Sequence, residues 1–234
     1  MIAGRQDACA QNNALWCDTV LKAAGARTEF HGGYWIAREK VLPLYPSIVT
    51  LAARPAADLY AALETLPQRA AVKDSFDSLD LSPLGFRKLF TGTWLFRPPV
   101  SEKRPPISSD WHKITHAETL KRWIAAWNAD ERLHTVFPAR LLERKTVDFA
   151  AVMKDGSIRA GGIFNSGPRL EGKEVLGLSN VFCRKSWLYS ALHSLLEPYA
   201  RRPVCTYEDD DGILPVYRQL GFEPCGRLGV WQKV

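Results

Sequence analysis

After residue 110, segments with the hydrophobic periodicity of a strand alternate with segments that have the periodicity of a helix. The segment WHKIT alternates like a strand, and HAETLKRWIAAW places Leu120, Trp123, Ile124 and Trp127 on one helical face. The segment VDFAAVMKDGSIRAGGIF reads as two strands joined at Asp155-Gly156. This dipeptide tolerates the positive φ angles of a tight hairpin turn. The pattern therefore predicts a strand, a helix and then a β-hairpin.

The remaining segments continue the alternation of strands and helices. They are a short helix in FPARLLER, a strand in EVLGLSNVFC, a helix in SWLYSALHSLLEPYA, a strand in RPVCTYE, a helix in ILPVYRQLG ending at Gly221, and a last strand in GRLGVWQKV. The predicted order is β-α-α-β-β-β-α-β-α-β. Because a helix joins the strands at 174–182 and 203–208, we expect them to pair in parallel.

The first hundred residues follow a similar alternation. Strands are predicted at 33–40, 45–53, 69–76 and 91–97, with an amphipathic helix at 56–66 and a short helix at 77–86. The segment SPLGFRKLFTGTWLFR then matches the C-terminal segment around LGFEPCGRLGVW: in both, Leu-Gly-Phe precedes a tryptophan, Trp94 or Trp231. We interpret the chain as two related parts that end alike.

Four prolines divide the chain near RPPVSEKRPPISSD. They rule out continuous regular structure there, and the charged residues keep the segment in water. We interpret 98–110 as a linker between a part spanning 1–97 and a part spanning 111–234. A long surface loop within one domain is the alternative.

The C-terminal element order and one short motif resemble the GNAT acetyltransferase superfamily. Domains of that family close with a helix that reads roughly Y-x-k-l-G-F, and Tyr217, Leu220, Gly221 and Phe222 match it. The resemblance covers about residues 110–234. It implies an α/β fold of the α+β type, in which helices flank a mixed sheet, preceded by a degenerate half-domain of the same kind. A Gly-Phe step after a helix is also a packing device in other α/β proteins.

The same resemblance implies an acetyl-coenzyme A site where a strand meets a helix. The family's pyrophosphate motif, R/Q-x-x-G-x-G/A, corresponds to Arg184–Tyr189, with Trp187 and Tyr189 at the two glycine positions. A helix N-terminus attracts phosphate through its free N–H groups and its dipole. The implied coenzyme contacts are Asn180, Val181, Phe182, Arg184, Lys185, Ser186 and Trp187, with Ser186 as a possible helix cap. The bland alternative is an ordinary capped helix with two packed aromatic residues.

The implied catalytic residues are Tyr217 and Glu208. Tyr217 stands where the family's tyrosine protonates the departing thiolate, and a phenol suits that role. Glu208 ends the CTYE strand and is the nearest candidate for the base that deprotonates an amine. The alternatives are a tyrosine packed under the last strand and a solvated acidic loop over 208–211. In the first part, His31, Tyr34, Trp35 and Arg38 are candidates to line a cleft between the two parts.

Composition restricts the other function classes. The formal net charge of +6 is spread along the chain rather than gathered into a basic stripe, so we expect no nucleic-acid partner. The five cysteines and five histidines show no metal-ligand spacing, so no metal is expected. No apolar run is long enough to cross a membrane, and no secretory signal is present, so a cytoplasmic protein is expected. The motifs of serine hydrolases and P-loop nucleotide binding are absent.

Two hypotheses follow. The first is an N-acyltransferase that moves an acetyl group from acetyl-coenzyme A to the amine of a small molecule or peptide. The second is a catalytically inactive GNAT-like binding or interaction module, which the aromatic residues Trp187 and Tyr189 favour. The acceptor and the oligomeric state are not predicted by the sequence.

Overall fold

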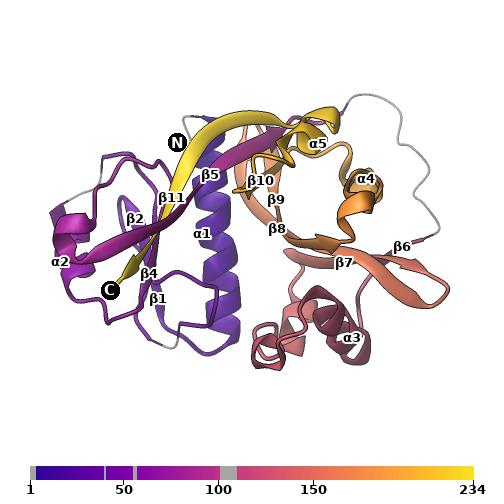
Figure 1. Cartoon of the computed structure of the whole chain (residues 1–234), viewed down its shortest axis with the longest axis horizontal. Coiled ribbons are helices and arrows are strands. Elements are labelled where there is room, and N and C mark those ends of the chain that lie inside the picture. The colour runs from indigo at the N-terminus through magenta and orange to yellow at the C-terminus, as the bar shows by residue number, and fades with distance from the viewer. Residues whose placement is uncertain (1–3, 40, 55–56, 101–109) are drawn as a thin grey trace.

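A single mixed sheet organises the whole protein (Figure 1). The computed structural model describes residues 4–39, 41–54, 57–100 and 110–234. The α-helices of these residues are α1 (Arg5–Ala23), α2 (Ala57–Glu64), α3 (Ala117–Trp127), α4 (Leu188–Leu196) and α5 (Leu214–Gln219). The strands are β1 (Thr28–Phe30), β2 (Tyr34–Ala37), β3 (Ile48–Thr50), β4 (Ala71–Asp74), β5 (Phe86–Arg97), β6 (Trp111–Lys113), β7 (Val147–Lys154), β8 (Ser157–Leu170), β9 (Lys173–Cys183), β10 (Val204–Glu208) and β11 (Glu223–Lys233).

The strands lie in the order β1-β2-β3-β4-β11-β5-β10-β9-β8-β7-β6. Two neighbouring pairs are parallel, β3 with β4 and β9 with β10, and the other pairs are antiparallel. Each parallel pair is joined through a helix, because parallel strands need a crossover connection. The predicted parallel pairing of 174–182 with 203–208 is confirmed.

Strands from the first hundred residues alternate with strands from the end of the chain at the centre of the sheet. β11 lies between β4 and β5, so the last strand of the chain pairs only with strands from the first hundred residues. β5 in turn pairs with β10. Figure 1 shows β5 and β11 running together across the middle of the molecule. The interpretation of residues 1–97 as a related half-domain stays a prediction, and most of the predicted linker, residues 101–109, lies outside the described residues.

The predicted turns form where the sequence places small residues. Asp155 and Gly156 both have positive φ, 50° and 72°, and join β7 to β8 as a two-residue hairpin. Gly221 ends α5 with φ 85°, and Phe222 buries its ring against Tyr217, with ring centroids 5.4 Å apart. Two predicted short helices are instead brief 3₁₀ turns, Ser82–Leu84 and Ala139–Glu143. Strand β5 begins at Phe86, five residues before its predicted start.

The largest difference from the sequence prediction is α1, because no element was predicted before residue 33. Its ten buried residues include the consecutive Ala8, Cys9 and Ala10 and the polar Asn12, so its apolar periodicity is weak. Asn12 is buried and donates hydrogen bonds from Nδ2 to the carbonyls of Asn165 and Val175, at 3.3 and 3.2 Å. Gly167 and Gly177 make room for it, since a Cβ at either position would overlap the Asn12 side chain. Polar docking over glycines therefore holds α1 on β8 and β9.

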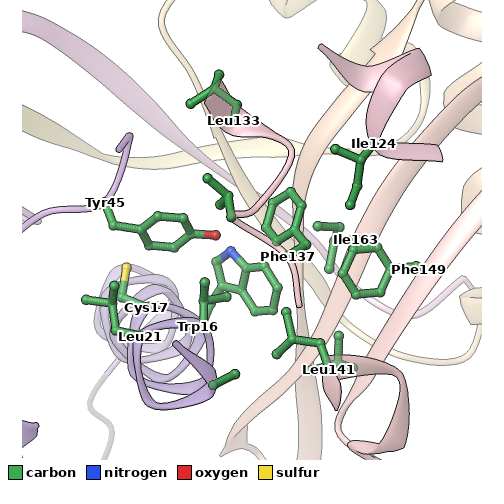
Figure 2. Close-up of a cluster of buried hydrophobic side chains, with 14 of the residues drawn as sticks. Trp16, Cys17, Leu21, Tyr45, Ile124, Leu133, Phe137, Leu141, Phe149 and Ile163 are labelled. Carbon is green, nitrogen blue, oxygen red and sulfur yellow. The ribbon is translucent and has the colours of Figure 1, made fainter. Parts of the chain in front are cut away.

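Helix α1 also joins the two parts of the chain. It lies between the strands of the first part and those of the second (Figure 1), and it contacts β3, β5, β8 and β9. Its Trp16 packs in one hydrophobic cluster with Phe137 and Phe149 of the second part (Figure 2). A separate cluster buries α4 and α5 on the other face, around Leu192, Tyr217 and Phe222. No helix in the described ranges is long and apolar enough to cross a membrane.

Candidate functional site

The candidate site begins where β9 and β10 separate. The two strands pair only at Val204 with Leu176 and at Cys205 with Gly177. Beyond this point the residues at 178–181 and 206–208 line a cavity of about 1110 Å³. A splayed pair of parallel strands thus creates an opening in the middle of an otherwise continuous sheet.

An irregularity in β9 lies at the mouth of this opening. Asn180 has a positive φ of 53°, and the pairing with β8 shifts between Gly161 and Ile163. Two residues of β9, Asn180 and Val181, therefore stand opposite Gly162. Such a β-bulge bends the strand and leaves a residue outside the hydrogen-bonded ladder. Asn180 and Val181 both line the cavity.

The cavity lies between the two parts of the chain, and both supply its walls. The second part contributes β9, β10 and Tyr217 of α5. The first part contributes α1, the segments 36–39, 41–47 and 65–71, and Lys73 of β4. The residues of α1 in the wall are Asn13, Trp16 and Cys17. The element that the sequence did not predict therefore forms one side of the site.

Tyr217 reaches the cavity from α5. Its side chain is 3% exposed, and burial raises the pKa of its phenol, with the nearby Glu208 carboxyl adding to the effect. The phenol therefore keeps its proton well above neutral pH. It lines the cavity near Glu208, at the edge where β10 ends. The two predicted catalytic residues share one cavity.

Glu208 ends β10 in a half-buried position. Burial raises the pKa of its carboxyl, while hydrogen bonds from the backbone N–H groups of Asp209 and Asp210 to Oε1 oppose the increase. A carboxyl with a raised pKa is a better proton acceptor once it is ionised. The other acidic residues of the run, 209–211, are exposed, as expected for a solvated loop.

The basic residues of the implied coenzyme site lie next to this loop. Arg184, Lys185, Ser186 and Trp187 are exposed and form the 3₁₀ turn that leads into α4. Nζ of Lys185 is 3.9 Å from Oδ2 of Asp210, so one acidic side chain faces the turn. The expected Ser186 cap is wrong, because neither the turn nor α4 has a side-chain cap hydrogen bond. The N–H groups at this helix start are not satisfied by side chains.

The two aromatic residues at the glycine positions turn outward. Trp187 is 43% exposed and Tyr189 is 44% exposed. Tyr189 stacks along α4 on His193, with ring centroids 6.1 Å apart, and neither aromatic lines the main cavity. The uncapped helix start and the exposed Arg184 fit a phosphate group, since free N–H groups and a cation both favour anions.

The structure brings four of the predicted site residues to the cavity: Asn180, Val181, Glu208 and Tyr217. Phe182 is directed elsewhere and packs edge-on against Trp123, with centroids 5.1 Å apart. In the first part only Arg38 of the four candidates lines the cavity. His31 stacks on Tyr34 at 4.5 Å, and Trp35 is fully buried and donates to Asp18.

Sequence reasoning missed several polar residues of the cavity. Ser179 Oγ is buried without a hydrogen-bond partner among the described residues. The Tyr45 hydroxyl points toward the indole of Trp16 without reaching hydrogen-bond geometry (Figure 2). Lys73 is a charged residue in a buried strand. A lysine within the predicted strand AAVKDSF was the sequence signal that could have pointed to this residue.

Comparison with solved structures identifies the architecture. A GCN5-related N-acetyltransferase from Kribbella flavida matches with a TM-score of 0.62 at 16% identity, covering 94% of this chain and 95% of that one. This protein has a GNAT-like fold. A putative acetyltransferase of the GNAT family from Novosphingobium aromaticivorans matches with a TM-score of 0.59 at 12% identity, over 99% and 100% of the two chains.

A third match has no stated activity. It is a functionally unknown conserved protein from Staphylococcus epidermidis, with a TM-score of 0.58 at 11% identity, over 88% of this chain and 92% of that one. No protein-family model and no curated protein sequence matches the chain. At identities this low the structural likeness shows the GNAT-like fold alone, and it extends over nearly the whole chain rather than only over residues 110–234.

Proposed function

We propose that the protein is an acyl-coenzyme A dependent N-acyltransferase that moves an acetyl group to an amine. The observation that carries this proposal is the opening between β9 and β10, which holds Tyr217 and Glu208 in one cavity beside the start of α4. An acid and a base that differ strongly in pKa at one opening are the groups that amine acylation requires. The GNAT-like fold supports the same conclusion.

The proposed acyl donor lies along the turn before α4. Arg184 and the free N–H groups of the helix start would hold its phosphates, and Asn180 and Val181 would lie beside its thioester end. Acetyl-coenzyme A supplies an activated carbonyl carbon and a thiolate leaving group. The exposed positions of Trp187 and Tyr189 leave the helix start accessible.

The two cavity residues have distinct proposed roles. Glu208 accepts the proton that the amine loses as its nitrogen bonds to the carbonyl carbon. Tyr217 donates its proton to the sulfur as the carbon–sulfur bond breaks. Since Glu208 acts only when ionised and its pKa is raised, activity should increase as the pH passes upward through that pKa. Burial keeps Tyr217 protonated over the same range.

The experiment that tests the proposal is a calorimetric titration with acetyl-coenzyme A. We expect binding at micromolar to millimolar concentration, and Arg184→Ala should weaken it by about 1.5–3 kcal/mol, the range for a hydrogen bond to a charged group. Arg218→Ala is the matched control, because Arg218 is an exposed arginine on α5 that does not line the cavity. Absence of binding at millimolar acetyl-coenzyme A would contradict the proposal and favour the binding module.

A further inference from the structure

Lys73 places a buried positive charge in the wall of the cavity. Its residue is 7% exposed, and it lines the cavity from β4. Its Nζ lies over the ring of Tyr207, 4.4 Å from the centroid. Within the described residues it has no ion pair and no hydrogen bond to a carboxylate. A lysine ammonium is seldom buried unless an anion accompanies it.

The other charged residues of the cavity wall differ from Lys73. Arg38 pairs with Glu29 at 2.8 Å, and Glu39 pairs with Arg27 at 2.6 Å. Arg69 is exposed to solvent. Lys73 is therefore the buried cation of the wall without an acidic partner in the described chain. Its contact with Tyr207 offsets part of the desolvation of the ammonium, since a cation is attracted to the face of an aromatic ring. A bound anion would offset more of it.

Lys73 and Glu208 approach the cavity from opposite faces of the sheet. Lys73 contacts Tyr207, and Glu208 is the next residue of β10. Neighbouring side chains of a strand point to opposite faces, so Lys73 lies on the α1 face and Glu208 points toward Tyr217. The nearby Lys73 also opposes the increase in the pKa of Cys17 on α1, which agrees with that face. The cavity connects both faces through the opening between β9 and β10.

We propose that the acceptor is an amine that also carries a carboxylate, and that Lys73 binds this carboxylate while the amine lies at Glu208. This inference rests on the acyl transfer proposed above. A single cation matches a group with one negative charge, whereas a phosphate would call for several donors. The aromatic residues Trp16, Tyr45 and Phe90 line the same cavity and would pack against an apolar side chain of the acceptor. Amino acids with large apolar side chains have this chemistry.

The transfer experiment uses acceptors matched in all but the carboxylate. L-Phenylalanine is compared with phenethylamine, and L-leucine with isoamylamine, each with acetyl-coenzyme A, by following release of the free thiol. The native protein should prefer the amino acid in kcat/KM by at least about 10-fold, and Lys73→Met should reduce this preference about 10- to 100-fold. Lys73→Arg keeps the charge and should keep most of the preference. Equal use of both acceptors by the native protein would overturn the proposal.

A matched control separates this role from stability. Lys88 also lies over an aromatic ring, that of Trp231 at 4.7 Å, but it pairs with Asp77 and lies outside the cavity wall. Lys88→Met should leave the preference for the amino acid unchanged. Thermal unfolding of each variant shows whether it is folded. A loss of preference in Lys88→Met as large as that in Lys73→Met would contradict a specific carboxylate contact.

A binding experiment distinguishes failure of this inference from failure of the proposed function. 3-Phenylpropanoate has the carboxylate and no amine, and 3-phenylpropanamide is its neutral counterpart. Calorimetry should show that the native protein binds the carboxylate at least about 10-fold more tightly than the amide, and that Lys73→Met removes the difference. Binding of the carboxylate without any acetyl transfer would contradict only the acyltransferase. Transfer to amines without selective carboxylate binding would contradict only the role of Lys73.

Discussion

Two segments of this protein have the same order of elements and differ in chemistry. Residues 71–97 run from β4 through a 3₁₀ turn into β5, and residues 204–233 run from β10 through α5 into β11. Each helical turn ends at a left-handed glycine, Gly85 with φ 77° and Gly221 with φ 85°, followed by a buried phenylalanine. In the sheet the second strand of each segment pairs with the first strand of the other: β5 with β10, and β11 with β4.

The two segments differ at the acidic residue that ends their first strand, Asp74 in β4 and Glu208 in β10. Asp74 is fully buried, and its carboxyl accepts hydrogen bonds from the Thr50 hydroxyl and from the backbone N–H groups of Phe76, Ser78 and Leu79. Glu208 accepts from the backbone N–H groups of the next two residues and lines the cavity. One carboxyl therefore holds a turn, and the other has capacity left for a ligand.

The position four residues before the glycine shows the same contrast. Leu81 lies fully buried in the first segment, in the cluster around α2. Tyr217 occupies the corresponding place in the second segment and presents a phenol to the cavity. The same order of elements thus carries a packed turn in one case and a candidate catalytic pair in the other. The order of elements therefore does not decide the chemistry that a segment carries.

The largest expected effect distinguishes the two carboxyl groups by stability. Asp74→Ala removes the acceptor for three backbone donors and one hydroxyl, of which the Leu79 N–H and the Thr50 hydroxyl then stay buried without this partner. We expect it to lower the free energy of unfolding by about 3–5 kcal/mol. Glu208→Ala should cost less than about 1 kcal/mol, because its two donors lie in an exposed loop. Urea denaturation measures both, and equal losses would remove the distinction drawn here.

The second effect concerns the two helical positions. Tyr217→Phe removes the hydroxyl and keeps the ring that packs on Phe222. If Tyr217 is the proton donor, turnover should fall about 10²-fold, the lower end for general acid catalysis, while acetyl-coenzyme A binds as before. Steady-state kinetics and calorimetry give the two readings. The control is Leu81→Met, a volume-conserving change at the matching position, which should leave turnover unaltered. A Tyr217→Phe variant with native turnover would exclude the phenol from catalysis.

The smallest effect tests what the two segments share. Gly85→Ala and Gly221→Ala each force a side chain into left-handed backbone, which costs about 1–2 kcal/mol. An added Cβ meets nothing within 4 Å at Gly85 and only the Arg97 side chain at 3.7 Å or more at Gly221. The two losses in unfolding free energy should therefore agree to within about 0.5 kcal/mol. Thermal or urea denaturation measures them, and a clearly larger loss at one glycine would show that its turn carries more than conformational strain.

Local sequence patterns determined much of the second part. Hydrophobic periodicity located α3 and α4, Asp155-Gly156 located the hairpin, and the helix between β9 and β10 indicated their parallel pairing. These features depend on residues close together in the chain. The Tyr217 and Gly221 spacing likewise indicated the closing helix, which ends where it was predicted to end.

Only the tertiary structure decided the shape and the walls of the candidate site. Helix α1 docks through Asn12 over Gly167 and Gly177, which lie more than 150 positions later in the chain. A polar contact of this kind leaves little hydrophobic periodicity to detect in the sequence. The place of β11 between β4 and β5 likewise depends on pairing between distant strands. The position of Lys73 in the cavity wall depends on the same contacts between distant segments. A local pattern records which face of an element is buried, but what buries that face, and which charge is left facing the cavity, follow from contacts that only the folded chain makes.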